Sequence, residues 1–208
     1  MKINYQLKME EKLREIIQQP KVPTLLLHSC CGPCSTYVLE ILSEYFQITI
    51  FYYNPNITEI EEYQRRAQEQ QFLIQKLNTK HPISFLEGNY QPKDFYNAIQ
   101  GLEKLGEGSE RCFSCYRLRL EETAKTAKKL GLDYFTTTLS VSPHKNSQVL
   151  NEIGQKLENK YQTSYLYSDF KKKNGYQRSI ELSENYNLYR QDYCGCIYSK
   201  LEKEQRKA

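Results

Sequence analysis

Short apolar segments alternate with amphipathic ones along most of the chain, and this alternation constrains the fold more than any other feature. Segments rich in β-branched, leucine or aromatic residues predict strands at residues 24–28, 47–53, 83–87, 134–139 and 164–167. Segments with apolar residues at helical spacing predict helices at residues 4–19, 36–45, 58–78, 92–102, 112–130 and 147–161. Strands that alternate with helices form parallel βαβ units, so we expect an α/β fold: a Rossmann-like, three-layer parallel sheet with helices on both faces.

The periodicity weakens after the last predicted strand. Residues 168–208 are basic and rich in tyrosine, and they contain the last two cysteines, so we expect an irregular Tyr- and Cys-rich C-terminal region there. The chain shows no internal repeat and no linker-like composition. We therefore expect a single catalytic domain over residues 1–208, with the α/β core at residues 22–167.

Composition excludes some classes of protein. No segment approaches the roughly 18 apolar residues that a membrane helix needs, and the charged N-terminal segment lacks the apolar centre of a secretory signal. We therefore expect a cytoplasmic protein with no membrane partner. The net charge of +4 is compatible with a nucleic-acid partner but does not require one.

The 7 cysteines carry the strongest chemical signal. They form three groups: Cys30, Cys31 and Cys34; Cys112 and Cys115; Cys194 and Cys196. Clustered cysteines in a chain without a secretory signal more often serve metal or redox chemistry than structural disulfides. The first group directly follows the first predicted strand, where parallel sheets build their sites, and the second begins a helix that can fold over the same edge.

Adjacent thiols such as Cys30 and Cys31 suit a tetrahedral zinc site poorly, but an iron–sulfur cube has irons far enough apart for neighbouring thiolates. Cys112 and Cys115 lie at a helix start, which favours thiolates; they fit a metal, one face of a cluster, or two structural thiols. These four cysteines together supply enough thiolates for a [4Fe–4S] cluster. Cys34 is either a ligand of a second metal or a buried thiol.

Cys194 and Cys196 are separated by one glycine, so a disulfide between them closes a small, strained ring. Strained disulfides are easily reduced and tend to be redox-active, although a metal-binding or idle pair of thiols has the same spacing. The glycine supplies the backbone freedom that such a ring needs.

Other polar residues are weaker candidates, because each has an ordinary structural explanation. His28 ends the first predicted strand as either a neighbour of the site or, more often, a core histidine. Residues 54–56 and 142–145 follow strands and either line a pocket or form turns. Glu62 and Arg66 are expected on a solvated helix face. A basic group fits either an RNA backbone or a solvated loop. It comprises Lys171, Lys172, Lys173, Tyr176 and Arg178.

Six motifs in combination are more specific than any one alone. They read HSCCGPCS, YNPNI with EEYQRR, RCFSCYRLRLEETA, TTTLSVSPHKN, DFKKKNGY and YRQDYCGCIYS. From about residue 25 to residue 199 the chain resembles the QueH-type epoxyqueuosine reductases. The resemblance implies the last step of queuosine biosynthesis, a cobalamin-independent two-electron deoxygenation of epoxyqueuosine in tRNA. The implied partners are a tRNA whose anticodon loop bears epoxyqueuosine, and an external electron donor.

The resemblance also implies cofactors and residue roles. By motif, the [4Fe–4S] cluster would be held by Cys30, Cys31, Cys112 and Cys115, beside an additional mononuclear iron. Cys194 and Cys196 would be the catalytic pair, as a redox-active disulfide. Gly32 stands where alanine is commoner and His144 where an aromatic residue is common, and neither change removes a thiolate.

Three other functions compete with this interpretation. A metal-stabilised RNA-binding module without redox turnover would leave the C-G-C pair without a purpose. An ATP-dependent tRNA thiolase needs a glycine-rich loop after the first strand, and SCCGPCS has one glycine, which argues against it. A thiol-based redox sensor would not need the basic, tyrosine-rich C-terminal region.

Overall fold

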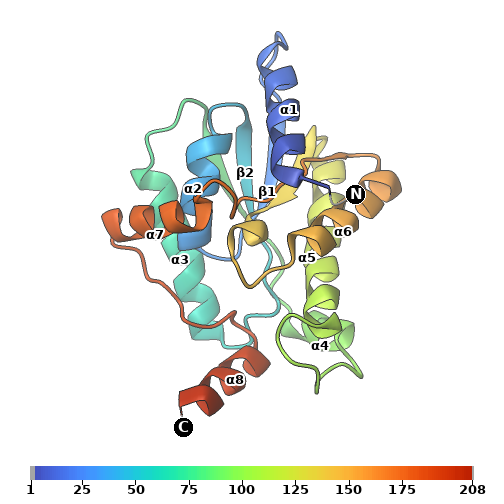
Figure 1. Ribbon diagram of the computed structural model, residues 1–208, viewed down its shortest axis with the longest axis vertical. Coiled ribbons are helices and arrows are strands. Elements are labelled where there is room, and N and C mark those ends of the chain that lie inside the picture. Colours follow the sequence, from blue (N-terminus) through green and yellow to red (C-terminus); the bar gives the residue numbers. More distant parts are fainter. Residues whose placement is uncertain (1–2, 208) are drawn as a thin grey trace.

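The computed structural model describes residues 3–207 and contains a five-stranded sheet in the order β3-β2-β1-β4-β5, with all paired strands parallel (Figure 1). The strands are β1 (Thr24–His28), β2 (Gln47–Tyr52), β3 (Ile83–Glu87), β4 (Tyr134–Thr137) and β5 (Ser164–Tyr165). The helices are α1 (Tyr5–Ile17), α2 (Gly32–Leu42), α3 (Ile60–Lys76), α4 (Pro92–Ala98), α5 (Glu110–Leu130), α6 (Ser147–Tyr161), α7 (Gly175–Asn185) and α8 (Ile197–Lys207). The predicted fold class is confirmed.

The central strand β1 is buried on both faces, and its side chains alternate between two cores. Leu25 and Leu27 pack in the core that α1, α2 and α3 cover. Leu26 points the other way and packs with residues of α5 and α6. The two-residue period of a strand therefore produces three layers, with α2 and α3 on one side of the sheet and α5 and α6 on the other (Figure 1).

The strand order reverses at β1, because the chain runs outward to β2 and β3 on one side and to β4 and β5 on the other. Such a reversal opens a crevice beyond the carboxyl ends of the two central strands. His28, the last residue of β1, is fully buried at this end of the sheet. Its Nδ1 lies 2.9 Å from the Thr137 hydroxyl, and its Nε2 lies 3.2 Å from the Tyr53 carbonyl oxygen.

The Tyr53 carbonyl can only accept a hydrogen bond, so Nε2 of His28 must donate one. Nδ1 of His28 then accepts a hydrogen bond from the Thr137 hydroxyl. Burial lowers the pKa of His28 to about 3, with the Arg119 charge acting in the same direction. His28 is therefore a neutral core histidine that ties together the ends of three segments of the sheet.

The C-terminal region is more regular than the sequence pattern indicates. It contains two helices, α7 and α8, and α7 packs beside α2 (Figure 1). Gly175 begins α7 against Tyr37 and the Phe170 carbonyl, where a Cβ atom would collide. The buried face of α7 thus consists mainly of small residues, which allow close packing beside α2. Within residues 3–207, no helix is both long and apolar enough to cross a membrane.

Candidate metal and redox site

Three cysteines meet where β1 ends and α2 begins. Cys30 follows the strand, Cys31 is the N-cap of α2, and Cys34 lies in the first turn, which starts earlier than predicted because Gly32 and Pro33 are helical. The three Sγ atoms all lie within 4.8 Å of one another, and those of Cys30 and Cys31 are 3.7 Å apart. Across residues 3–207, no other three His, Cys, Asp or Glu side chains are grouped this closely.

The pKa values of these thiols are shifted in opposite directions. Hydrogen bonding with the Cys31 and Cys34 thiols holds the pKa of Cys30 well below its usual value. Burial, together with the same hydrogen bond, raises the pKa of Cys31 to about 12. Metal binding by such a group would release the remaining protons.

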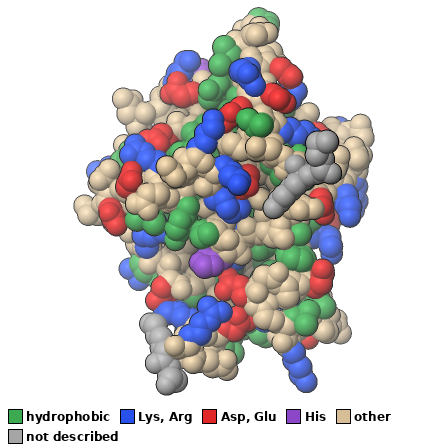
Figure 2. All heavy atoms as spheres, in the orientation of Figure 1, with side chains coloured by type: hydrophobic (Ala, Val, Ile, Leu, Met, Phe, Trp, Pro, Cys, Tyr) green, Lys and Arg blue, Asp and Glu red, His purple; other side chains and the backbone are tan. Residues whose placement is uncertain are grey.

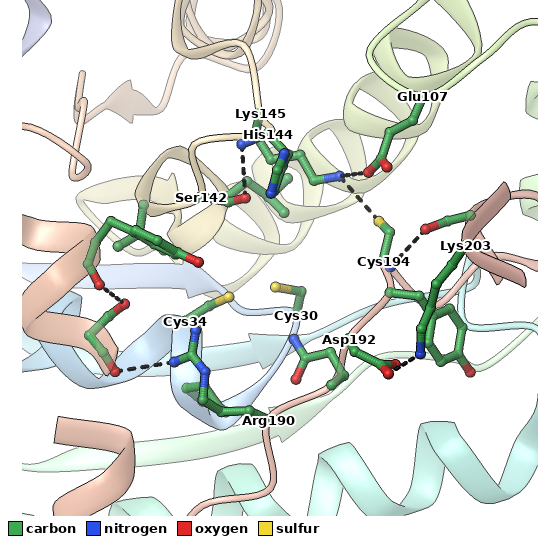
Figure 3. Close-up of a pocket in the computed structure, with 18 of the residues that line it drawn as sticks. Cys30, Cys34, Glu107, Ser142, His144, Lys145, Arg190, Asp192, Cys194 and Lys203 are labelled. Carbon is green, nitrogen blue, oxygen red and sulfur yellow. Dashed lines mark hydrogen bonds and ion pairs between the residues drawn. The ribbon is translucent and has the colours of Figure 1, made fainter. Parts of the chain in front are cut away.

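The other four cysteines line a second, smaller cavity. Cys112 and Cys115 come from the first turns of α5, and Cys194 and Cys196 come from the segment before α8. Cys194 also lines the larger cavity into which Cys30 and Cys34 point (Figure 3). Six of the seven cysteines thus line two adjoining cavities, and the buried Cys31 lies beside Cys30 and Cys34 without lining either cavity. All seven are free thiols, and the close group of three does not extend to Cys112 or Cys115.

Buried polar atoms around the smaller cavity lack partners. Among residues 3–207, Asn56 Oδ1, Tyr116 Oη and Arg119 Nη2 are buried without a hydrogen bond, and all three residues line this cavity. Buried polar groups in proteins are nearly always satisfied, so these atoms are available to hydrogen-bond an ordered water or a bound group. Lys145 and Arg111 add positive charge to the same walls. Thiols and cations together fit an anionic thiolate-ligated metal centre.

Arg66 of α3 anchors the segment that carries Cys194. The Arg66 guanidinium donates to the carbonyl oxygens of Cys194 at 3.1 Å and Tyr193 at 3.3 Å, and it pairs with Glu62 at 2.6 Å. Arg66 is 1% exposed, so the expectation of a solvated face is wrong for this residue. Its spacing of four from Glu62 indicates a local ion pair, but no sequence pattern shows its contact with a segment 128 positions away.

Gly195 is required for the shape of this segment. Its φ of +113° is rarely adopted by other residues, and a Cβ atom there would lie 2.8 Å from Ile57 Cγ1. The Gly195 carbonyl accepts the Thr58 amide at 3.3 Å, which fixes the loop to the segment after β2. The glycine of the C-G-C motif therefore has a structural role besides separating the two thiols.

The two thiols of this motif have different surroundings. The sulfur of Cys194 lies 3.3 Å from Lys145 Nζ, which also pairs with Glu107 at 3.3 Å (Figure 3). Cys196 is buried, and burial raises its pKa to about 12. Cys194 is therefore the thiol that reaches a cation and the larger cavity, while Cys196 is the internal partner. Ser142, His144 and Lys145 line the larger cavity, so residues 142–145 belong to the site and are not merely a turn.

The larger cavity has a volume of about 330 Å³, at the lower end of the range for ligand pockets, roughly 300–1,000 Å³. Its walls combine the sulfurs of Cys30, Cys34 and Cys194 with polar side chains from the C-terminal region. Among these, Gln191 Nε2 donates to Cys31 Sγ at 2.8 Å. The C-terminal region thus covers the cysteine crevice rather than extending away from it.

The basic group at residues 171–178 is largely neutralised by neighbouring acids. Lys171 pairs with Asp169 at 2.8 Å, Arg178 pairs with Glu40 at 2.6 Å, and Lys173 pairs with Glu10. On the face shown in Figure 2, acidic side chains lie among the basic ones. Tyr176 is the member of this group that lines the larger cavity.

The family model described as Epoxyqueuosine reductase QueH matches residues 25–202. The chain belongs to this family. A protein named Epoxyqueuosine reductase QueH from Streptococcus pyogenes serotype M1 is 44% identical over 200 residues, which cover 95% of this chain and 78% of that protein. Proteins of the same name from Staphylococcus epidermidis and Thermotoga maritima are 44% and 35% identical, over 97% and 89% of this chain and 86% and 94% of their own. The predicted family resemblance is confirmed.

Proposed function

We propose that this protein is an epoxyqueuosine reductase, an oxidoreductase of queuosine biosynthesis that acts on tRNA. It removes the epoxide oxygen of epoxyqueuosine without cobalamin, as the last step of that synthesis. The observation that carries the proposal is the family match over residues 25–202, on a chain in which six of the seven cysteines line two adjoining cavities and the seventh, Cys31, lies within 4.8 Å of two of them. The proposal includes a cytoplasmic location.

The proposed cofactors are a [4Fe–4S] cluster and an additional mononuclear iron. The proposed cluster ligands are Cys30, Cys31, Cys112 and Cys115. Thiolates are the donors that such clusters use, and the unpartnered polar atoms beside Cys112 and Cys115 support a group bound there. When bound, these groups supply one-electron transfer and a Lewis acid for the epoxide oxygen.

Cys194 and Cys196 are the proposed catalytic pair. Conversion of an epoxide to an alkene and water consumes two electrons and two protons. Oxidation of the dithiol to a disulfide releases two electrons and two protons, so the pair supplies the electrons and the protons that the reaction consumes. An external electron donor then reduces the disulfide. The position of Cys194 between Lys145 and the larger cavity supports its role as the thiol that faces the substrate.

The larger cavity is the proposed site for the modified nucleoside. Enzymes that act on a base in RNA take it out of the stack and into a pocket, and a volume of about 330 Å³ is of the right order for one nucleoside. Lys145 and Arg190 offer hydrogen-bond donors for its oxygens. The tRNA anticodon loop would then lie across the mouth of this cavity.

Anaerobic purification, followed by iron, sulfide and absorption measurements, tests the proposal. We expect about four sulfides and at least four irons per chain, with visible absorption that dithionite bleaches. The double variant Cys112→Ser/Cys115→Ser should lose this absorption and the conversion of epoxyqueuosine-tRNA. Ser114→Ala, in the same helical turn, should retain both.

One zinc per chain and no sulfide, with tRNA bound but not deoxygenated, would instead favour a metal-stabilised RNA-binding module. Retention of the cluster absorption by the double serine variant would refute the ligand assignment.

A further inference from the structure

Four Lys and Arg side chains are buried among residues 3–206, and one of them has no acidic partner. Arg66 pairs with Glu62, Arg111 with Glu202 and Lys145 with Glu107. Arg119 is 1% exposed, yet it takes part in none of the ion pairs of the described residues. Each of the other three buried cations has a carboxylate partner, so the missing partner of Arg119 requires an explanation.

Arg119 lies four residues after Cys115, which places both side chains on the same face of α5. Its Nε donates to the Cys115 carbonyl at 3.4 Å and its Nη1 to Asn54 Oδ1 at 3.4 Å. Both bonds are long, and Nη2 has no partner in the described residues. The guanidinium is thus anchored at one end, with an unused donor at the other.

This unused donor lies in the wall between the two cysteine-lined cavities. Arg119 lines the smaller cavity with Cys112, Cys115, Cys194 and Cys196, and it also lines the larger one with Cys30. An arginine keeps its charge in any protein environment, and an unpaired buried charge is strongly unfavourable. With no carboxylate beside it, the compensating negative charge must come from the thiolates of the cavity walls or from what these cavities bind.

We infer that Arg119 is the internal counter-charge of the thiolate-ligated metal centre and raises its reduction potential. This inference rests on the proposed function, because it assumes that a cluster binds among these cysteines. Each electron that enters such a centre adds one negative charge, and a fixed cation in a low-dielectric site stabilises the more negative state. Loss of the guanidinium should therefore make the centre harder to reduce.

The midpoint potential of the holoenzyme, measured by redox titration with visible and electron paramagnetic resonance detection, tests this role. In Arg119→Met we expect the reduction equilibrium to become at least tenfold less favourable, a potential about 59 mV lower for a one-electron couple. Arg119→Lys keeps the charge and should recover most of the difference. Arg117→Met removes an exposed arginine from the same helix and should leave the potential unchanged. If Arg119→Met takes up no iron, Arg119→Gln replaces it in the comparison.

Thermal unfolding of the full chain prepared without metal gives a second, independent readout. If the charge of Arg119 is compensated only when an anion binds, Arg119→Met should raise the unfolding temperature of the metal-free protein by about 3 °C or more. A structural arginine would give the opposite sign. An unchanged potential in Arg119→Met with normal iron content, or a less stable metal-free Arg119→Met chain, would overturn the inference. If the wild-type protein assembles no cluster, the proposed function fails, and the unfolding experiment still tests the uncompensated charge.

Discussion

Replacement of Arg66 by methionine tests whether this buried side chain holds the C-G-C segment in place. Methionine fills much of the same volume but removes the ion pair with Glu62 and both hydrogen bonds to the carbonyls of Tyr193 and Cys194. Glu62 would keep only the Tyr189 hydroxyl, at 3.2 Å. The change therefore leaves a largely buried carboxylate and two backbone acceptors without their cation.

Removal of one partner from a buried ion pair costs about 3–5 kcal/mol. For a chain of this size each kcal/mol moves the midpoint of thermal unfolding by about 2–4 °C, so Arg66→Met should unfold roughly 6–20 °C below the wild type. Lysine keeps the charge but cannot reproduce the forked donor geometry, and Arg66→Lys should lose about 1–3 kcal/mol of unfolding free energy.

The assay combines thermal unfolding, followed by circular dichroism, with iodoacetamide labelling of Cys194 and Cys196, read by peptide mass spectrometry. Both thiols should react faster in Arg66→Met, because their segment has lost its anchor. Arg65→Met is the matched control: Arg65 is exposed and stacks on the Tyr189 ring at 3.4 Å, a contact worth about 1 kcal/mol or less. Equal stability of the Arg65 and Arg66 variants, with unchanged labelling, would refute the reasoning.

Two further substitutions test the neighbourhood of the same thiols. Lys145→Met removes the ammonium beside Cys194, and alkylation of Cys194 in the reduced protein should slow by roughly 3- to 10-fold while Cys196 is unaffected; equal slowing of both thiols would contradict the assignment of Lys145 to Cys194. Gly195→Ala places a Cβ against Ile57 at a φ of +113° and should cost about 1–3 kcal/mol in a urea titration, whereas Gly106→Ala, which has open space around it, should be near neutral; equal effects would exclude backbone strain at Gly195.

The layered α/β fold and the place of the first cysteine group follow from local sequence patterns alone. The period of two in the strands and of 3.6 in the helices is local, and so is the rule that a parallel strand delivers its next residues to the site edge. The predicted bounds of the strands at residues 24–28 and 83–87 agree with β1 and β3. The proximity of Cys30, Cys31 and Cys34 follows from one strand end and one helix turn.

Only the tertiary structure showed which distant segments complete the site. The contact of Arg66 with Cys194 spans 128 positions, and that of Lys145 with Cys194 spans 49, so no local pattern reveals either. The helix α7 was missed because the face that it buries beside α2 holds Gly175, Ser179 and Ser183 with one leucine, Leu182, so no apolar pattern marks it. Local periodicity records which face of an element is buried, whereas the partner that buries it depends on how the whole chain closes.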